Sequence, residues 1–442
     1  MSGKLLKLIN NNVLAGVFLV FTFCQCSQKE QKTSAGKDII RLSYWCASNP
    51  RETELAKELV AEWNKNNDSI KVDMQPIPSS QSSEEVLLAA IAANTTPDIC
   101  SNMWPGAMDV YIKSGGLVRL DQFADFEEFI TARVPQELLA SFKAGDGHYY
   151  QLPWKTNPTM VVYNKRLFRE AGVSAPLKTY SEFIRAAGKL TVDRDGDGHT
   201  DQWMIYRNIN PIWWQRLFDF YPFYIAASGG RSLFNGNVID FDNNYSVEVF
   251  RFFRTLYQNR YIPITEFQGD KFLAQILATQ ISGPYFIAYI KQYKGESLDI
   301  GVMPVPVPDD YSGPVYSLGD YKNISIFNNS KYPRHAWQFA KTLISKKADL
   351  RLLELASQIP VRKNLTSDSL YMSYFRKEPE IAAFAEQALY TRGVDGISDL
   401  KEILDIISQE YESCVVYQKA SAEEAISRAK DRVKVIMEWN RN

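Results

Sequence analysis

An acidic loop in the middle of the chain has the spacing of a calcium-binding loop. Asp193, Asp195, Asp197 and Asp201 occupy loop positions 1, 3, 5 and 9, and a glycine occupies position 6. A hard divalent cation needs several oxygen ligands on a short turning backbone, and this spacing supplies them. Position 12 is a methionine where a bidentate glutamate is usual, so a solvated acidic turn is the alternative. We expect a structural calcium or such a turn, and no other cofactor.

Aromatic and polar residues that could hold a sugar follow several predicted strands. Aromatic rings stack on the apolar face of a sugar, while amide, hydroxyl and carboxylate groups bond its hydroxyls. For each aromatic residue the alternative is a place in the core. Trp213 and Trp214 are adjacent, so we expect one in a cleft and the other packed. The predicted ligand-binding residues are Trp45, Ser48, Asn49, Asn102, Trp104, Trp154, Asn157, Trp213, Trp214, Tyr285, Asp320 and Tyr321.

No motif for catalysis or nucleic-acid binding is present. His148, His199 and His335 are scattered, and the sequence has no Ser-His-Asp order, paired-histidine metal motif or phosphate-binding loop. Lys plus Arg number 50 and Asp plus Glu 51, a balance that argues against a phosphate-binding surface. We predict a protein that is not an enzyme and does not bind nucleic acid. A secreted glycan-active enzyme is the alternative, because carboxylates are plentiful.

The N-terminus reads as an export signal with a lipid attachment point. Lys4 and Lys7 precede an apolar run over 13–23, which is too short to span a bilayer. Residues 1–25 are the predicted lipoprotein signal peptide, with Cys26, or alternatively Cys24, carrying the lipid. Residues 26–38 form a flexible tether. The mature protein is then extracytoplasmic and anchored to a bacterial membrane; a plain cleavable signal peptide is the alternative.

The remaining cysteines and the periodic segments describe a globular α/β protein. Cys46, Cys100 and Cys414 allow at most one disulfide, between the first two, and buried free thiols are the alternative. Strands alternate with helices at first, which predicts a parallel sheet with right-handed crossovers. The alternation continues and ends in a helical C-terminal part, 379–439. Predicted strands are 39–45, 70–74, 98–100, 159–163, 300–304 and 324–326, and predicted helices are 52–64, 83–93, 180–190, 247–259 and 334–344.

Several segments, taken in order, resemble one family. They are residues 96–99, 115–121, 150–153, 163–172, 176–183, 282–285 and 336–340. Together they are similar to the bacterial extracellular solute-binding proteins typified by maltose-binding and multiple-sugar-binding proteins. The sequence departs from the family at Tyr285, where the family often has Trp, and at Gly319-Asp320, where it often has a glycine pair.

The resemblance implies a two-lobe, type II periplasmic binding protein-like α/β fold with the ligand clamped between the lobes. The implied lobe 1 is 39–153 plus 321–357, and lobe 2 is 154–320 plus 358–442, with the first crossing near 152–154. It further implies a monomer that captures a sugar or oligosaccharide for the permease subunits of an ABC importer. A non-sugar solute, such as a polyamine or peptide, is the alternative ligand.

Overall fold

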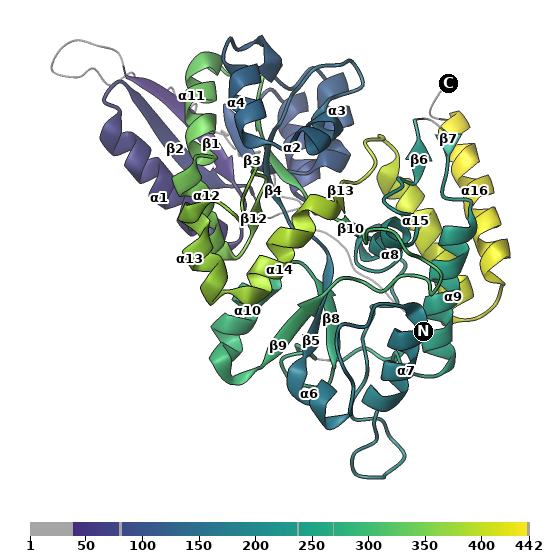
Figure 1. Ribbon diagram of the computed structural model, residues 1–442. Coiled ribbons are helices and arrows are strands. Elements are labelled where there is room, and N and C mark those ends of the chain that lie inside the picture. Colours follow the sequence, from purple (N-terminus) through teal and green to yellow (C-terminus); the bar gives the residue numbers. More distant parts are fainter. Residues whose placement is uncertain (1–38, 79–81, 237, 268, 440–442) are drawn as a thin grey trace, which may run out of the picture.

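Two lobes, each built around its own β-sheet, make up the chain (Figure 1). The structure is a computed structural model that describes residues 39–78, 82–236, 238–267 and 269–439. The predicted signal peptide, Cys24, Cys26 and the tether lie outside the described residues. Within the described part of the chain, no helix has the length and apolarity needed to cross a bilayer.

Lobe 1 contains a six-stranded sheet in the order β12-β4-β11-β3-β1-β2. As predicted, β1 pairs in parallel with both β2 and β3, whereas β11 runs antiparallel to β3 and β4. In β1 the alternate residues Leu42, Tyr44 and Cys46 are buried on one face. The strands are β1 (Ile40–Cys46), β2 (Ile70–Pro76), β3 (Ile99–Met103), β4 (Leu152–Thr156), β11 (Lys322–Ile326) and β12 (Ile359–Pro360).

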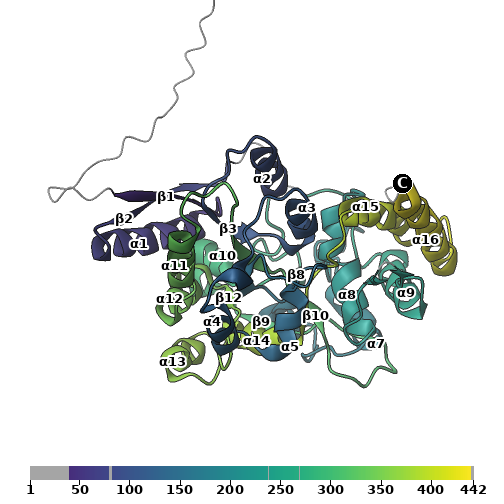
Figure 2. The same ribbon diagram turned by 90° about the horizontal axis from the view of Figure 1, so that it is seen from above.

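Helices cover both faces of this sheet (Figures 1 and 2). α1 begins after Asn49, whose side chain accepts a hydrogen bond from the Glu52 amide, and buries Leu55 and Leu59. α1, α4, α11 and α12 share one hydrophobic core, while α2 and α3 pack on the other face. The helices are α1 (Pro50–Asn66), α2 (Ser83–Ala92), α3 (Met108–Lys113), α4 (Phe126–Arg133), α5 (Gln136–Leu139), α11 (Pro333–Leu343) and α12 (Lys346–Ala356).

Lobe 2 contains a smaller sheet of three strands in the order β8-β5-β9. β5 is antiparallel to both of its neighbours. The continued alternation of strands and helices along the sequence had suggested an extension of the parallel sheet, but lobe 2 does not extend it. The strands are β5 (Met160–Asn164), β8 (Thr279–Ser282) and β9 (Ile300–Met303), with short pairs β6 (Phe234–Asn235) and β7 (Val238–Ile239), and β10 (Ser317–Leu318) and β13 (Thr391–Arg392).

The rest of lobe 2 is helical, and α8, α9, α15 and α16 form one packed group (Figure 1). α7 spans the predicted residues and opens with a capping box at Thr179 and Glu182. The helices are α6 (Lys165–Glu170), α7 (Tyr180–Leu190), η4 (Trp213–Leu217), α8 (Phe220–Ala227), α9 (Asn244–Gln258), α10 (Tyr285–Lys294), α13 (Ser369–Lys377), α14 (Pro379–Gln387), α15 (Leu400–Tyr411) and α16 (Ala422–Trp439).

Two crossing segments run side by side between the lobes. The amide of Asn157 donates to the carbonyl of Asp320 (3.3 Å), and the amide of Asp320 donates to the carbonyl of Asn157 (3.1 Å). A Cβ on Gly319 would lie 2.6 Å from Thr156 Oγ1, so this close approach requires glycine. The first crossing therefore follows β4 at Asn157, later than the expected 152–154, because those residues belong to the sheet of lobe 1.

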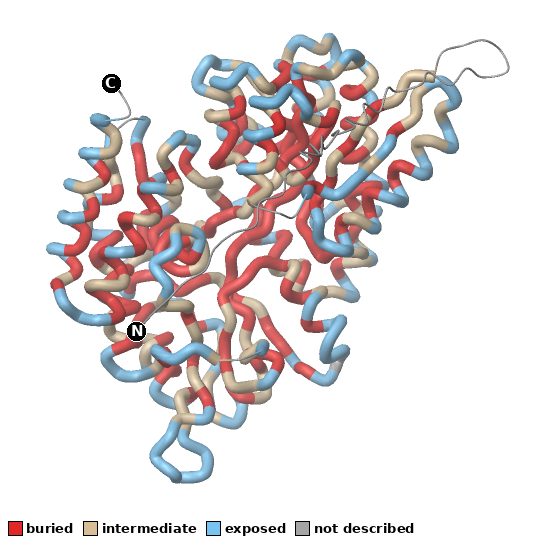
Figure 3. Tube along the Cα trace, turned by 180° about the vertical axis from the view of Figure 1, so that it is seen from behind, coloured by how far each residue is buried: buried red, intermediate tan, exposed pale blue. Residues whose placement is uncertain are grey.

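Buried backbone runs through both sheets and through the crossing segments, and exposed backbone lies at the periphery (Figure 3). One hydrophobic cluster includes Cys100 and Trp104 of lobe 1 together with Phe223 and Ile403 of lobe 2, so the two lobes are packed against each other. The three described cysteines are buried free thiols, which decides against the disulfide between Cys46 and Cys100.

Candidate functional site

Three adjoining cavities form what we call the cleft: two lie between the lobes, and the third is lined by lobe 2 residues beside them. We name them the α10 cavity (about 390 Å³), the Trp104 cavity (about 180 Å³) and the β8 cavity (about 270 Å³). Asp320 and Lys322 border the first two, Tyr285 borders the first and third, and Phe218 borders the second and third. The shared lining residues show that the three cavities lie next to one another, and the first two have walls from both lobes.

The α10 cavity contains most of the predicted polar residues. Its lobe 1 side comes from the start of α1, the end of β3 and the end of β4, and its lobe 2 side comes from α10. Asn157 Oδ1 is buried without a hydrogen-bond partner among the described residues, so a ligand donor could satisfy it. Predicted residues that line this cavity are Asn49, Asn102, Asn157, Tyr285 and Asp320.

Asn102 adopts an uncommon backbone conformation at the edge of this cavity. Its φ is +70°, in the left-handed region, although Asn102 lies within β3, just before Met103. A non-glycine residue in this region costs on the order of 1 kcal/mol, and asparagine tolerates it better than most. The pairing of β3 with β11 is irregular at this point, and Asn102 lies on the cavity wall.

An ion pair that the sequence prediction omitted lies in the wall of the α10 cavity. Lys155 Nζ is 2.5 Å from Glu52 Oε2, and both side chains are almost fully buried. Gln358 Nε2 and Asn49 Nδ2 donate to Glu52 Oε1 at 2.7 and 2.6 Å. Burial alone would raise the pKa of the Glu52 carboxyl, but the adjacent Lys155 ammonium lowers the pKa below its ordinary value. Glu52 is thus held ionised, the opposite of what a general acid needs.

Tyr285 and Asp320 both line the α10 cavity, and Tyr285 also lines the β8 cavity while Asp320 also lines the Trp104 cavity. Burial, and then the negative charge of Asp320, raise the pKa of Tyr285 to about 12. The phenol is therefore protonated at neutral pH and can donate a hydrogen bond. Lys322 Nζ lies 2.5 Å from Asp320 Oδ1. The charges beside Tyr285 are thus paired with each other, which leaves ring faces and neutral donors and acceptors for a ligand.

Tryptophans from both lobes meet in the Trp104 cavity. The ring centroids of Trp104 and Trp213 are 5.5 Å apart with a 38° tilt. Trp214 lines the neighbouring β8 cavity and is 43% exposed. Trp213 is partly buried against the hydrophobic cluster that joins the lobes, whereas the cavity beside Trp214 is lined by lobe 2 residues alone. The irregular turn of η4 directs one ring into each cavity.

Four predicted ligand residues are not among those that line the cleft. Trp154 and Tyr321 are 5% and 3% exposed and belong to the core of lobe 1. The Tyr321 hydroxyl is hydrogen-bonded to Thr391 Oγ1 at 2.7 Å. Trp45 is half-buried against the hydrophobic cluster that joins the lobes, and Ser48 is exposed ahead of α1. Both Trp154 and Tyr321 lie on segments beside the cleft, but their side chains face the interior.

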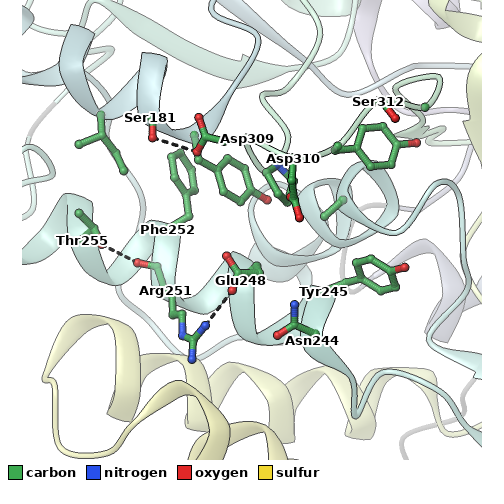
Figure 4. Close-up of a pocket in the computed structure, with 16 residues that line it drawn as sticks. Ser181, Asn244, Tyr245, Glu248, Arg251, Phe252, Thr255, Asp309, Asp310 and Ser312 are labelled. Atoms are coloured by element: carbon green, nitrogen blue, oxygen red, sulfur yellow. Dashed lines mark hydrogen bonds and ion pairs between the residues drawn. The ribbon is translucent and has the colours of Figure 1, made fainter.

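A larger cavity, of about 720 Å³, lies within lobe 2 (Figure 4). Its walls come from α7, α8, α9 and residues 308–313, so movement of one lobe against the other would not enclose a ligand there. Its polar groups also engage each other: Ser181 donates to Asp309 (2.9 Å), and Arg251 pairs with Glu248 (2.8 Å) (Figure 4). The cleft is the better candidate for the ligand site.

The acidic loop of lobe 2 brings together three of its four predicted metal ligands. Carboxylate oxygens of Asp193, Asp195 and Asp197 lie within 4.8 Å of one another, and all three residues are exposed. Asp201 lies outside this group, and its Oδ2 accepts a hydrogen bond from the Arg194 amide at 2.8 Å. Backbone hydrogen bonds, led by the one from Gly198, lower the pKa of Asp193, which favours the ionised form that a cation needs.

Several cleft residues were missed because local sequence gives them another explanation. Glu52 is the third residue of α1, where an acidic side chain is already expected from capping and the helix dipole. Lys155 is in β4, where every residue is buried. Polar and exposed residues therefore do not alternate along this strand, and the sequence does not indicate whether Lys155 faces the core or the cleft. Other charged, amide and aromatic residues that line the cleft and were missed include Arg51, Glu84, Tyr206, Arg207, Phe218, Tyr289, Gln292, Lys322 and Gln358.

Comparisons with known proteins agree with this architecture. A family model described as bacterial extracellular solute-binding protein matches residues 47–349. A maltotriose-binding protein of Pyrococcus abyssi is 24% identical over 371 residues, 81% of this chain and 73% of that protein. An uncharacterized Listeria monocytogenes protein of known structure is 24% identical with a TM-score of 0.79, over 90% of this chain and 100% of that chain. The cyclic alpha-maltosyl-1,6-maltose binding protein of Arthrobacter globiformis is 19% identical with a TM-score of 0.77, over 90% and 99%. The predicted two-lobe periplasmic binding protein fold is thus confirmed.

Proposed function

The chain belongs to the bacterial extracellular solute-binding protein family, and we propose that it captures a neutral sugar or oligosaccharide outside the cytoplasm for an ABC importer. One observation carries the choice of ligand: the cleft between the lobes combines aromatic rings with neutral polar groups, and its buried charges are paired with each other. A polyamine would need unpaired carboxylates, whereas a sugar needs ring faces and hydroxyl partners.

Ligand capture would work by closure of the two lobes about the crossing segments at Asn157 and Asp320. Rings from both lobes would then cover the sugar, and Asn157, Tyr285 and Asn102 would bond its hydroxyls. The closed form would be the one that the permease subunits recognise. The protein would act as a monomer, since each chain carries both sides of its own cleft.

A thermal-shift screen with a glycan panel tests the ligand class. A ligand present at 100 times its dissociation constant should add about 2.7 kcal/mol to the free energy of unfolding. We expect at least one neutral glycan to do so, with spermidine and a short peptide as comparison ligands. Stabilisation by spermidine or the peptide alone would refute the sugar proposal and leave the solute-binding role in place.

The proposed role includes binding without turnover. Glu52 is ion-paired and its pKa is lowered, so it is unsuited to protonate a glycosidic oxygen. Incubation of the protein with the glycan that stabilises it, followed by chromatography of the sugar, should return the glycan unchanged. Appearance of shorter products with pure protein would favour the enzyme instead.

Two further features complete the proposal. A lipid on Cys26, or on Cys24, would hold the protein at a bacterial membrane, supported by the short apolar run that precedes these cysteines. Replacing both cysteines by alanine should release the protein from the membrane fraction; wild-type protein that is already soluble and unacylated would refute the anchor.

A calcium ion held by Asp193, Asp195 and Asp197 would brace the acidic loop of lobe 2.

A further inference from the structure

Three tyrosines form a row along α10, beginning inside the cleft and ending outside it. Tyr285, Tyr289 and Tyr293 are four residues apart, so each lies about 6 Å further along the helix on nearly the same face. Tyr285 and Tyr289 line the α10 cavity, as do Ala288 between them and Gln292 further along the helix. Tyr293 continues this face beyond the cavity, and α10 lies beside β9 at the edge of lobe 2 (Figure 1).

The two outer tyrosines are only partly packed. α10 buries Phe286, Ile287 and Ile290, and the Phe286 ring stacks on the ring of Tyr289 with centroids 5.8 Å apart. Tyr289 is 38% exposed and Tyr293 is 59% exposed, and their ring centroids are 4.8 Å apart. Neighbouring exposed aromatic rings that continue a binding surface indicate a ligand contact rather than a core role.

Charged groups of both signs lie around this row. The last turn of α10 carries Lys291 and Lys294, of which Lys291 is paired with Glu378. Burial, and then the negative charge of Asp270, raise the pKa of Tyr289, so this phenol is uncharged at neutral pH. A row of ring faces at roughly regular spacing suits a repeating ligand of flat apolar faces, such as linked sugar rings.

We propose that Tyr289 and Tyr293 are outer stacking positions for a linear oligosaccharide, whose inner rings lie in the cleft at Tyr285 and whose outer rings lie along α10. This inference rests on the proposed sugar-binding function and specifies its substrate: a glycan chain longer than the cleft itself. The ligand enters with one end in the α10 cavity and the other end exposed to solvent.

Calorimetric titration with a length series tests the inference. The probe is the disaccharide, the trisaccharide and longer members of the neutral glycan series that stabilises the protein, with malto-oligosaccharides tried first. For the wild type, affinity should rise as the chain is lengthened past the cleft. Tyr293→Ala should weaken binding of the long members about three- to tenfold and leave the disaccharide unchanged. Tyr293→Phe, which keeps the ring face, should behave as the wild type.

Tyr417→Ala is the matched control, because Tyr417 is 50% exposed and lies in the C-terminal part of lobe 2 away from α10. It should alter neither affinity nor its dependence on length. If glycans bind but Tyr293→Ala leaves the affinity for long members unchanged, Tyr293 is not an outer stacking position. An effect of this variant on transport alone would not rescue the inference, because it would indicate a contact with a protein partner. If no glycan binds at all, the proposed function itself fails and this inference fails with it.

Discussion

The indole rings of Trp104 and Trp213 meet across the cleft, with their centroids 5.5 Å apart. Trp104 follows β3 of lobe 1 and Trp213 begins η4 of lobe 2, so the contact joins the two lobes directly. Trp104 is 5% exposed in this arrangement. The pair therefore closes the Trp104 cavity on one side while presenting aromatic surface to its interior.

Replacing Trp213 should weaken two things: the contact that holds the lobes together in the ligand-free protein, and ligand binding. We expect Trp213→Ala to increase the radius of gyration of the ligand-free protein, measured by small-angle X-ray scattering, because the contact with Trp104 is lost. Glycan affinity should fall about tenfold, about 1.4 kcal/mol, through loss of a stacking face. Trp214→Ala is the control: it should weaken binding without changing the scattering. Unchanged scattering for Trp213→Ala would show that the pair does not hold the lobes.

The buried pair of Glu52 and Lys155 should make stability depend on acid pH. The pKa of Glu52 in the folded protein is below its ordinary value of 4.5, so the unfolded chain takes up this proton first as pH falls. The stabilising contribution of Glu52 is therefore fully present above about pH 4.5 and is lost as pH falls through the lower folded pKa. Urea unfolding at a series of acid pH values should show a shallower loss of stability for Glu52→Gln than for the wild type.

Three further variants test the assignment of this pair. Glu54→Gln, at a half-exposed carboxylate two residues away, should keep the wild-type pH dependence. Lys155→Met should lower the free energy of unfolding by about 3–5 kcal/mol at neutral pH, because it leaves Glu52 buried without its partner. Combining it with Glu52→Gln should recover part of that loss. Equal pH dependence in wild type and Glu52→Gln would contradict the assignment of the pair.

Calcium should raise the melting temperature if the acidic loop binds it. A calcium concentration 100 times the dissociation constant would add about 2.7 kcal/mol, which differential scanning fluorimetry with and without chelator detects. Asp195→Asn with Asp197→Asn should abolish the difference, because both residues are in the carboxylate group. Asp201→Asn is the control, since Asp201 lies outside that group. Equal melting temperatures for the wild type with calcium and with chelator would identify a solvated turn.

Hydrophobic periodicity predicted the helices and strands well. It did not predict which face of a strand a given side chain occupies, and that face decides whether the side chain reaches the cleft. The predicted strand-helix order of lobe 1 matches β1 to β3, because hydrophobic spacing reports directly on which face is buried. The antiparallel pairing of β5 with β8 depends on contacts between residues more than a hundred positions apart. No local pattern encodes such a pairing.

The site prediction shows the same limit within β4. Successive strand residues face opposite sides, so of two neighbours only one can reach the cleft. Trp154 was chosen for its chemistry, but it faces the lobe 1 core, while Lys155 faces the cleft. Every residue of β4 is buried, so the sequence contains no polar alternation that reveals the correct side. Tyr285 lines the α10 cavity, where the turn at Gly283-Pro284 after β8 had suggested it would project, and its role in ligand binding stays a prediction.

Alanine substitution should separate the core residue from the cleft residue. Trp154→Ala should lower the free energy of unfolding of the ligand-free protein by about 3–5 kcal/mol, because a buried ring is lost from the lobe 1 core. It should also remove the cation–π contact with Lys155 Nζ, which lies 4.4 Å from the ring centroid. Tyr285→Ala should instead weaken glycan binding about tenfold, about 1.4 kcal/mol, and change unfolding of the ligand-free protein far less. Urea unfolding and calorimetric titration of both variants measure the two quantities. A large loss of stability for Tyr285→Ala, with binding retained, would place Tyr285 in the core and remove the inner end of the tyrosine row.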